Sequence, residues 1–193
     1  MNWKNIFGKK KEEEKPYKYR GLLHLWEDDY LMMELIPGEN QDFVTKEINR
    51  INNFSNENFD GIGFTDITPI SEKALKTINR KIPIKDIKDI FSKSKLDIVD
   101  EIVMQGEELL EKSKIPLAFG NKDFAIIIES KDALLENIWI TGAVDTQGNL
   151  IEVKKCFLEF ATKYNFIAVN WFLCRSYNLK IEKEIEDFLL YNE

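Results

Sequence analysis

The sequence predicts an α+β fold: a single domain with a mainly antiparallel sheet and helices packed against it. The chain has 193 residues, the usual length of one domain. Hydrophobic residues make up 44% of it, which is enough to bury a substantial core. Apolar runs of strand length and segments of helical periodicity come in clusters rather than in strict alternation. That order favours an α+β arrangement over a parallel α/β sheet.

The N-terminal segment differs from the rest of the chain in charge. Residues 1–20 hold seven Lys or Arg and three Glu, a net of +4, so the other 173 residues hold 20 basic and 31 acidic groups, a net of −11. We therefore predict a mobile basic tail at residues 1–19 and one α+β domain at residues 20–193. The few apolar side chains of the tail make a poor anchor, so no membrane contact is expected through it.

The segment 22–40 organises the predicted domain. Two apolar runs, residues 20–26 and 30–36, flank an acidic Glu-Asp-Asp sequence, and Pro37-Gly38 ends the second run. Both faces of the first run are largely apolar, as in a strand of a sheet that is covered on both sides. We predict that the two runs form a β-hairpin with the carboxylates exposed at its tip.

Between residues 42 and 104 the periodicity predicts helices with short strands around them. One helix is expected to run from Asp42, as its cap, to Phe54, and another to span residues 84–91. The other expected elements are a strand at residues 61–67, a short helix that begins at Ser71 and is broken by Pro83, and a strand at residues 96–104 that could instead continue as a helix through residue 112.

The C-terminal part of the chain has clearer patterns. Strands are predicted at residues 124–129, 138–144 and 166–174, the last being the most apolar and expected at the centre of the sheet. Helices are predicted at residues 150–164 and 181–189, because apolar side chains recur there at helical spacing. Cys156 and Cys174 lie in apolar surroundings and are expected to be buried free thiols.

No pattern in the sequence predicts a catalytic centre, a metal site or a cofactor. The single histidine, His24, lies on an apolar run with no partner at metal-ligand spacing, so a structural role is favoured. Gly61-Ile62-Gly63 resembles the start of a dinucleotide fingerprint, but the third glycine and the following helix are missing. The excess of acidic groups disfavours nucleic acid as a partner.

The acidic sequence Glu27-Asp28-Asp29 is the one concentrated polar feature. It lacks the ligand spacing of a calcium loop, and one turn cannot place two carboxyls across a substrate. A solvated turn and a contact surface for a cationic partner both remain open, since clustered carboxylates accept bidentate bonds from arginine. The aromatic neighbours Trp26 and Tyr30 favour the contact surface, which we predict to extend to Glu34, Glu39 and Asn40.

Four short motifs stand out: WEDDY and LMMELIP within residues 26–37, NIWIT at residues 137–141 and FIAVNW at residues 166–171. They resemble motifs of small bacterial immunity proteins, which are encoded beside polymorphic or contact-delivered toxins. The resemblance covers residues 19–40 and 137–190 and leaves residues 68–122 without support. It implies an inhibitor without enzymatic activity, which binds a cognate toxin stoichiometrically.

Two alternatives to a toxin-neutralising immunity protein stay open. One is a small enzyme whose site is built from dispersed carboxylates and His24. The other is a membrane-peripheral adaptor that uses the basic tail. The absence of a secretory signal and of an apolar run of about 18 residues predicts a cytoplasmic location. The expected partner is a toxin protein with a basic contact surface.

Overall fold

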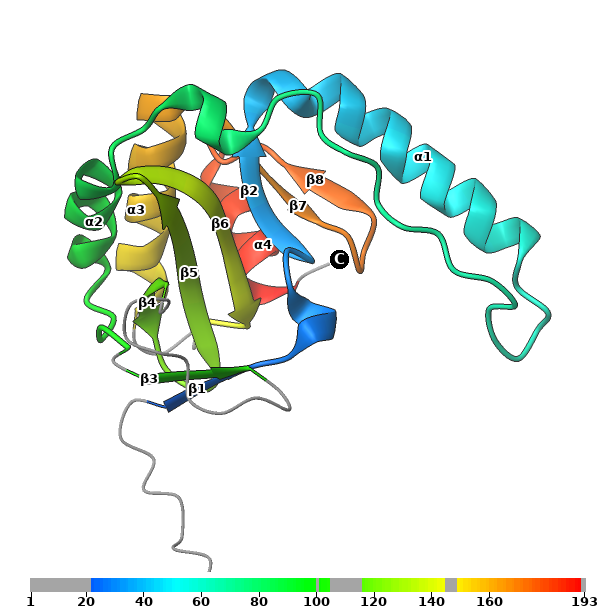
Figure 1. Cartoon of the computed structure of the whole chain (residues 1–193), viewed down its shortest axis with the longest axis horizontal. Helices are drawn as coiled ribbons and strands as arrows, with labels where there is room; N and C mark the ends of the chain where they lie inside the picture. Colours follow the sequence, from blue (N-terminus) through cyan, green and yellow to red (C-terminus); the bar gives the residue numbers. More distant parts are fainter. Residues whose placement is uncertain (1–21, 100, 105–115, 145–148, 192–193) are drawn as a thin grey trace, which may run out of the picture.

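The computed structural model describes residues 22–99, 101–104, 116–144 and 149–191, and it confirms the α+β fold (Figure 1). The main sheet has the strand order β4-β5-β6-β2-β7-β8, and every neighbouring pair in it is antiparallel. A separate ribbon consists of β1 and β3, which pair in parallel. The predicted tail at residues 1–19 lies outside the described residues.

The elements have the following bounds. The strands of the main sheet are β2 (Met33–Pro37), β4 (Leu117–Gly120), β5 (Phe124–Lys131), β6 (Leu134–Gly142), β7 (Phe166–Asn170) and β8 (Arg175–Tyr177). The ribbon strands are β1 (Leu22–Leu25) and β3 (Glu101–Met104). The α-helices are α1 (Gln41–Glu57), α2 (Ile84–Phe91), α3 (Leu150–Tyr164) and α4 (Glu182–Leu190).

One face of the sheet is covered by α2, α3 and α4, and this layer contains the largest core (Figure 1). Phe157 of α3 lies inside it, with its ring centroid 5.6 Å from that of Phe91 and 6.3 Å from that of Phe188. These three side chains come from three different helices, so all three helices pack against one another in this core. Alternate residues of the central strands, such as Met33 and Leu35, enter it from the sheet.

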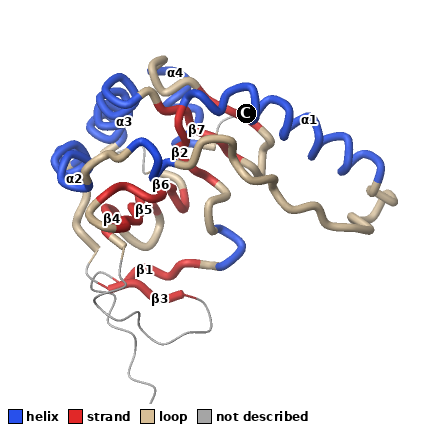
Figure 2. Tube along the Cα trace, turned by 45° about the horizontal axis from the view of Figure 1, so that its top comes forward, coloured by secondary structure: helices blue, strands red, loops and turns tan. Residues whose placement is uncertain are grey.

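The opposite face of the sheet has two separate covers. The β1–β3 ribbon packs Leu23, Leu25 and Ile102 against β4, β5 and β6. Helix α1 packs at the other end of this face, where Val44 contacts a cluster that includes Ile36 and Val169. Figure 2 shows the ribbon and α1 on the two sides of β2, well apart from each other. The part of the face between these covers is where a cavity forms.

The predicted hairpin at residues 22–40 is wrong. Strand β1 pairs with β3, whereas β2 pairs with β6 and β7 in the other sheet. Residues 27–29 form a 3-10 helix, and Leu31 adopts a φ of 58°, so the chain turns from one sheet into the other. Strand β1 buries Leu23 and Leu25 on one face only. His24 and Trp26 are exposed, which corrects the two-sided burial expected for this run.

Other predictions are corrected in detail. Residues 61–67 form no strand and show only an isolated bridge between Phe59 and Phe64. The segment after Ser71 contains only a 3-10 turn at Thr77–Arg80, and the strand expected at residues 96–104 is reduced to β3. Strand β7 is second from the edge, because β8, which the sequence patterns did not predict, lies outside it. Strand β4 was missed as well.

The helices are predicted best, since α1, α2, α3 and α4 all coincide with the expected segments within a few residues. Asp42 does not cap α1, which begins at Gln41 after Asn40. Both thiols are free, with Cys156 buried and Cys174 half-buried. Within the described part of the chain, no helix is long and apolar enough to cross a membrane.

Candidate functional site

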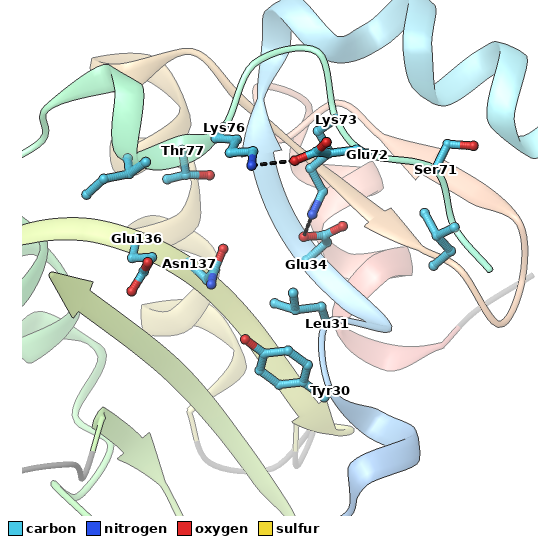
Figure 3. A pocket seen from close by; sticks show the side chains of 12 residues that line it. Tyr30, Leu31, Glu34, Ser71, Glu72, Lys73, Lys76, Thr77, Glu136 and Asn137 are labelled. Carbon is cyan, nitrogen blue, oxygen red and sulfur yellow. Dashed lines mark ion pairs between the residues drawn. The ribbon is translucent and has the colours of Figure 1, made fainter.

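A cavity of about 400 Å³ opens on the sheet face between the β1–β3 ribbon and α1 (Figure 3). Its walls come from the start of β2, the start of β6 and the segment that follows α1. The lining residues are Tyr30, Leu31, Glu34, Ile70, Ser71, Glu72, Lys73, Lys76, Thr77, Ile78, Glu136 and Asn137. Apolar and ionisable groups thus both line this opening.

Glu34 is the buried carboxylate of this cavity. It points to the second face of the sheet because its neighbours Met33 and Leu35 point into the helical core. Its side chain is only 4% exposed, and Lys73 Nζ lies 2.7 Å from Glu34 Oε2. The indole Nε1 of Trp171 donates to Glu34 Oε1 at 2.9 Å. Burial raises the pKa of Glu34, although Lys73 and Trp171 oppose that rise.

A second carboxylate, Glu129 on β5, binds three donors beside the cavity. It accepts hydrogen bonds from Tyr30 Oη at 3.2 Å, from Asn137 Nδ2 at 2.7 Å and from Trp139 Nε1 at 3.2 Å. The rings of Tyr30 and Trp139 also meet edge to face, with centroids 5.5 Å apart. Desolvation, followed by the charge of Glu129, raises the pKa of Tyr30 to about 12. Tyr30 is therefore a fixed hydrogen-bond donor at neutral pH.

Carboxylates exceed cations around the cavity. Among the lining side chains, Lys73 pairs with Glu34 and Lys76 pairs with Glu72, and Glu136 adds a further negative charge. Glu129 lies directly behind Tyr30 and Asn137. A negative opening with an aromatic wall suits a guanidinium or ammonium group, which carboxylates bind and an aromatic ring can also contact.

The acidic turn, residues Glu27–Asp29, leads directly into this cavity through Tyr30. On its other side lies a hollow of about 290 Å³ whose walls include His24, Trp26, Asp29, Lys122 and Phe172. The aromatic side chains here are well exposed: Trp26 by 52%, Phe172 by 53% and Tyr30 by 40%. The turn is thus a carboxylate ridge between two hollows, each with an exposed aromatic side chain on its wall.

The structure brings together most of the residues predicted as a contact surface. Trp26, Glu27, Asp28, Asp29 and Tyr30 form the ridge and its flanks, and Glu34 lies at the base of the neighbouring cavity rather than on the surface.

Glu39 and Asn40 do not belong to this surface. Glu39 is ion-paired with Arg80. Asn40 is fully buried and clamps the chain at Leu75, with its Nδ2 donating to the Leu75 carbonyl oxygen at 2.8 Å and its Oδ1 accepting from the Leu75 N–H at 3.0 Å. Asn40 thus has a structural role, which corrects its inclusion in the predicted surface, whereas Glu39 is exposed but is not among the residues that line either hollow.

Sequence patterns missed the residues that come from other elements. These residues, which are separated from the acidic turn by many positions and reach its neighbourhood only through the fold, are Lys73, Glu129, Glu136 and Phe172. The one available signal was the NIWIT motif, whose Asn137 and Trp139 both donate to Glu129.

In the segments that the structure describes, no group of three or more His, Cys, Asp or Glu side chains is arranged to hold a metal ion. Among the described residues that line its hollow, His24 is accompanied by one carboxylate, that of Asp29. Comparisons of the chain with protein-family models, with curated proteins and with solved structures found no match.

Proposed function

We propose that the protein is an immunity protein: it binds a cognate bacterial toxin with a basic contact surface and neutralises it by forming a stoichiometric complex. The observation that carries the proposal is the exposed acidic turn between two hollows, with Tyr30 on one side and Trp26 and Phe172 on the other. The motif resemblance to immunity proteins at residues 26–37, 137–141 and 166–171 supports the same function.

The physical basis of binding would be charge and aromatic contact together. A chain with a formal net charge of −7 attracts a basic partner over long range. The carboxylates of the ridge would then accept bonds from arginine or lysine, and the exposed rings would provide contact area at low entropic cost. The negative cavity beside Tyr30 would take one cationic side chain of the toxin.

The first test uses the product of the adjacent gene. The two proteins are co-expressed, purified by a tag on one of them and analysed by light scattering for a complex of defined stoichiometry. The same pair is tested in cells for protection against the toxic effect of that product. A failure to associate, together with a failure to protect, rejects the proposal.

Charge reversal locates the contact surface. Asp28→Lys with Asp29→Lys is expected to slow association about tenfold at low ionic strength, and the effect should shrink as salt is added. The matched control is Asp89→Lys with Glu159→Lys, which makes the same change in net charge at exposed positions of α2 and α3. Equal effects of the two pairs would show that the acidic turn is not the contact surface.

One observation favours a second function, that of a small enzyme. Glu34 is a buried carboxylate with a raised pKa in an open cavity, and such groups often act in acid–base catalysis. Glu34→Gln separates the two functions, because it keeps the shape of the cavity and removes the titrating group. Full protection by this variant supports the inhibitor, whereas lost protection with an intact complex supports the enzyme.

A further inference from the structure

An arm projects from the body of the described structure (Figures 1 and 2). We define it as residues 41–70, which comprise α1 and the segment that returns along it. The first turns of α1 pack on the sheet through Val44, while the far end of the arm extends away from the body in both views (Figures 1 and 2). The cavity, the acidic turn and the three cores use none of the residues at its far end.

The arm tip, residues 58–67, exposes four large apolar side chains. Phe59 is 53% exposed, Ile62 96%, Phe64 66% and Ile67 90%. The rings of Phe59 and Phe64 contact each other with centroids 5.5 Å apart, and Ile62 lies in the turn between them. Four exposed apolar side chains within one turn, two of them in contact, are typical of a binding surface, whereas exposed apolar residues scattered singly are not.

The backbone of the arm tip is ordered by its own hydrogen bonds. Asp60 Oδ1 accepts from the N–H groups of Ile62 and Gly63 at 2.9 Å each, and these bonds lower the pKa of Asp60. The Thr65 N–H donates to the Asn58 carbonyl oxygen at 2.8 Å, and Gly61 supplies the φ of +96° that the turn requires. Because the turn is already formed, binding through it loses little conformational entropy.

The two limbs of the arm are also joined to each other by hydrogen bonds. The Arg50 guanidinium donates to Glu47 Oε1 at 2.6 Å, to Thr68 Oγ1 at 2.6 Å and to the Pro69 carbonyl oxygen at 2.7 Å. Glu47 Oε1 in turn accepts from the Ser71 N–H at 2.6 Å. These bonds join the two limbs of the arm, so the returning segment is held against α1 on the body side of the arm tip.

The charges around the tip identify the kind of partner. Between Arg50 and Lys73 the chain has no Lys or Arg, and its four carboxylates are those of Glu57, Asp60, Asp66 and Glu72. Membrane-inserting segments rely on basic groups that meet anionic lipid, so this composition disfavours a bilayer. An apolar tip surrounded by carboxylates fits an apolar protein pocket with Lys or Arg at its rim.

We propose that the arm tip inserts into an apolar pocket, rimmed by Lys or Arg, on the surface of a partner protein, with Ile62 and Phe64 as the anchoring side chains. This inference does not depend on the partner being a toxin, because it rests on the arm alone. The tip acts as a preformed docking element, separate from the acidic turn.

The test begins with photo-crosslinking in cells of the source organism. Benzoylphenylalanine is placed at Ile62 in the full chain, and the crosslinked peptides are identified by mass spectrometry. The control carries the same group at Lys155, which is exposed on α3. The expected result is a discrete adduct, specific to position 62, on a partner segment that is apolar and flanked by Lys or Arg. No adduct beyond the control, an adduct with a second copy of this chain, or an adduct with lipid alone overturns the proposal.

Affinity measurements with the identified partner complete the test. Calorimetry with purified proteins is expected to show that Ile62→Ser with Phe64→Ser lowers the affinity at least about tenfold. Glu57→Lys is expected to weaken binding more at low salt than at high salt. Ile151→Ser, which changes another exposed isoleucine on α3, is the matched control and should bind as the unchanged protein does. Equal affinities for the tip variant and this control overturn the proposal. Circular dichroism confirms that each variant is folded.

Discussion

Glu34 and Lys73 form an ion pair that is nearly enclosed by the protein. The side chain of Glu34 is 4% exposed and that of Lys73 is 20% exposed, with 2.7 Å between the charged atoms. Removing one partner of a buried pair leaves a charge without compensation, which is more damaging than removing both. We expect Lys73→Met to lower the free energy of unfolding by about 3 kcal/mol at pH 8. Lys73→Met combined with Glu34→Gln should recover part of this loss.

The decrease in the free energy of unfolding caused by Lys73→Met should depend on pH, and this dependence tests whether the unpaired charge of Glu34 is responsible. Burial already raises the pKa of Glu34, and removal of Lys73 should raise it further. A group with a raised folded pKa contributes stability at low pH and loses that contribution as the pH rises through the folded pKa. The deficit of Lys73→Met should therefore be smaller at pH 5 than at pH 8. Urea titrations at both pH values measure it, and equal deficits would show that Glu34 does not titrate as expected.

The contribution of Glu47 to the free energy of unfolding has the opposite dependence on pH. The bonds from Arg50, together with the Ser71 N–H, lower the pKa of Glu47 to about 2. A lowered folded pKa contributes stability above the unfolded value of about 4.5 and loses it as the pH falls toward 2. We expect Glu47→Gln to cost about 2 kcal/mol at pH 7, and this difference from the unchanged protein should disappear between pH 5 and pH 2. Urea unfolding across that range is the measurement, and a constant difference would contradict it.

The candidate site could be predicted from the sequence only where its residues are adjacent along the chain. Trp26 to Tyr30 were found because their side chains follow one another along the chain. Glu34 was predicted on the same surface, but the two-residue alternation of a strand cannot tell which face is covered, and this carboxylate is buried. Lys73 and Glu129 reach the site through folding alone, so no local pattern indicates them.

At the scale of the elements, the start of helix α1 is held to a later segment of the chain by the side chain of Asn40. Asn40 is fully buried and exchanges two hydrogen bonds with the backbone of Leu75, which fixes the end of the returning segment. We expect Asn40→Ala to lower the free energy of unfolding by about 2 kcal/mol, because the two backbone groups at Leu75 would lose their partner. Hydrogen exchange should speed up at residues 68–76 and remain unchanged in α3. Uniform acceleration over both segments would contradict this local role.

Helices were predicted better than strands for a physical reason. The face of α3 that contains Val153, Phe157 and Phe160 is visible in the sequence because helical periodicity is local. The partner of a strand is chosen by the whole fold, so β1 was assigned to β2 although it pairs with β3. The strand expected at residues 61–67 failed because its apolar residues face solvent at the arm tip instead of a sheet.

At the scale of the whole molecule, the two faces of the sheet have different roles. The helical face is filled by one continuous core that joins α2, α3 and α4 to the strands. The other face is covered in two separate places, by α1 and by the β1–β3 ribbon, and it leaves a cavity between them. Stability should therefore come mainly from the first face, and the second is free to carry binding surfaces.

This division predicts different consequences for mutations on the two faces. Phe157 is fully buried between Phe91 and Phe188, so Phe157→Ala should lower the free energy of unfolding by about 4 kcal/mol through lost burial and the cavity it leaves. Ile51→Ala on α1, where the side chain is only partly buried, should cost about 1 kcal/mol. In native-state hydrogen exchange, the first change should lower protection in α3, β5 and β6 together, because they share one core. Ile51→Ala should lower protection mainly in α1. Lower protection throughout the protein in this variant would show that the arm and the body unfold as one unit.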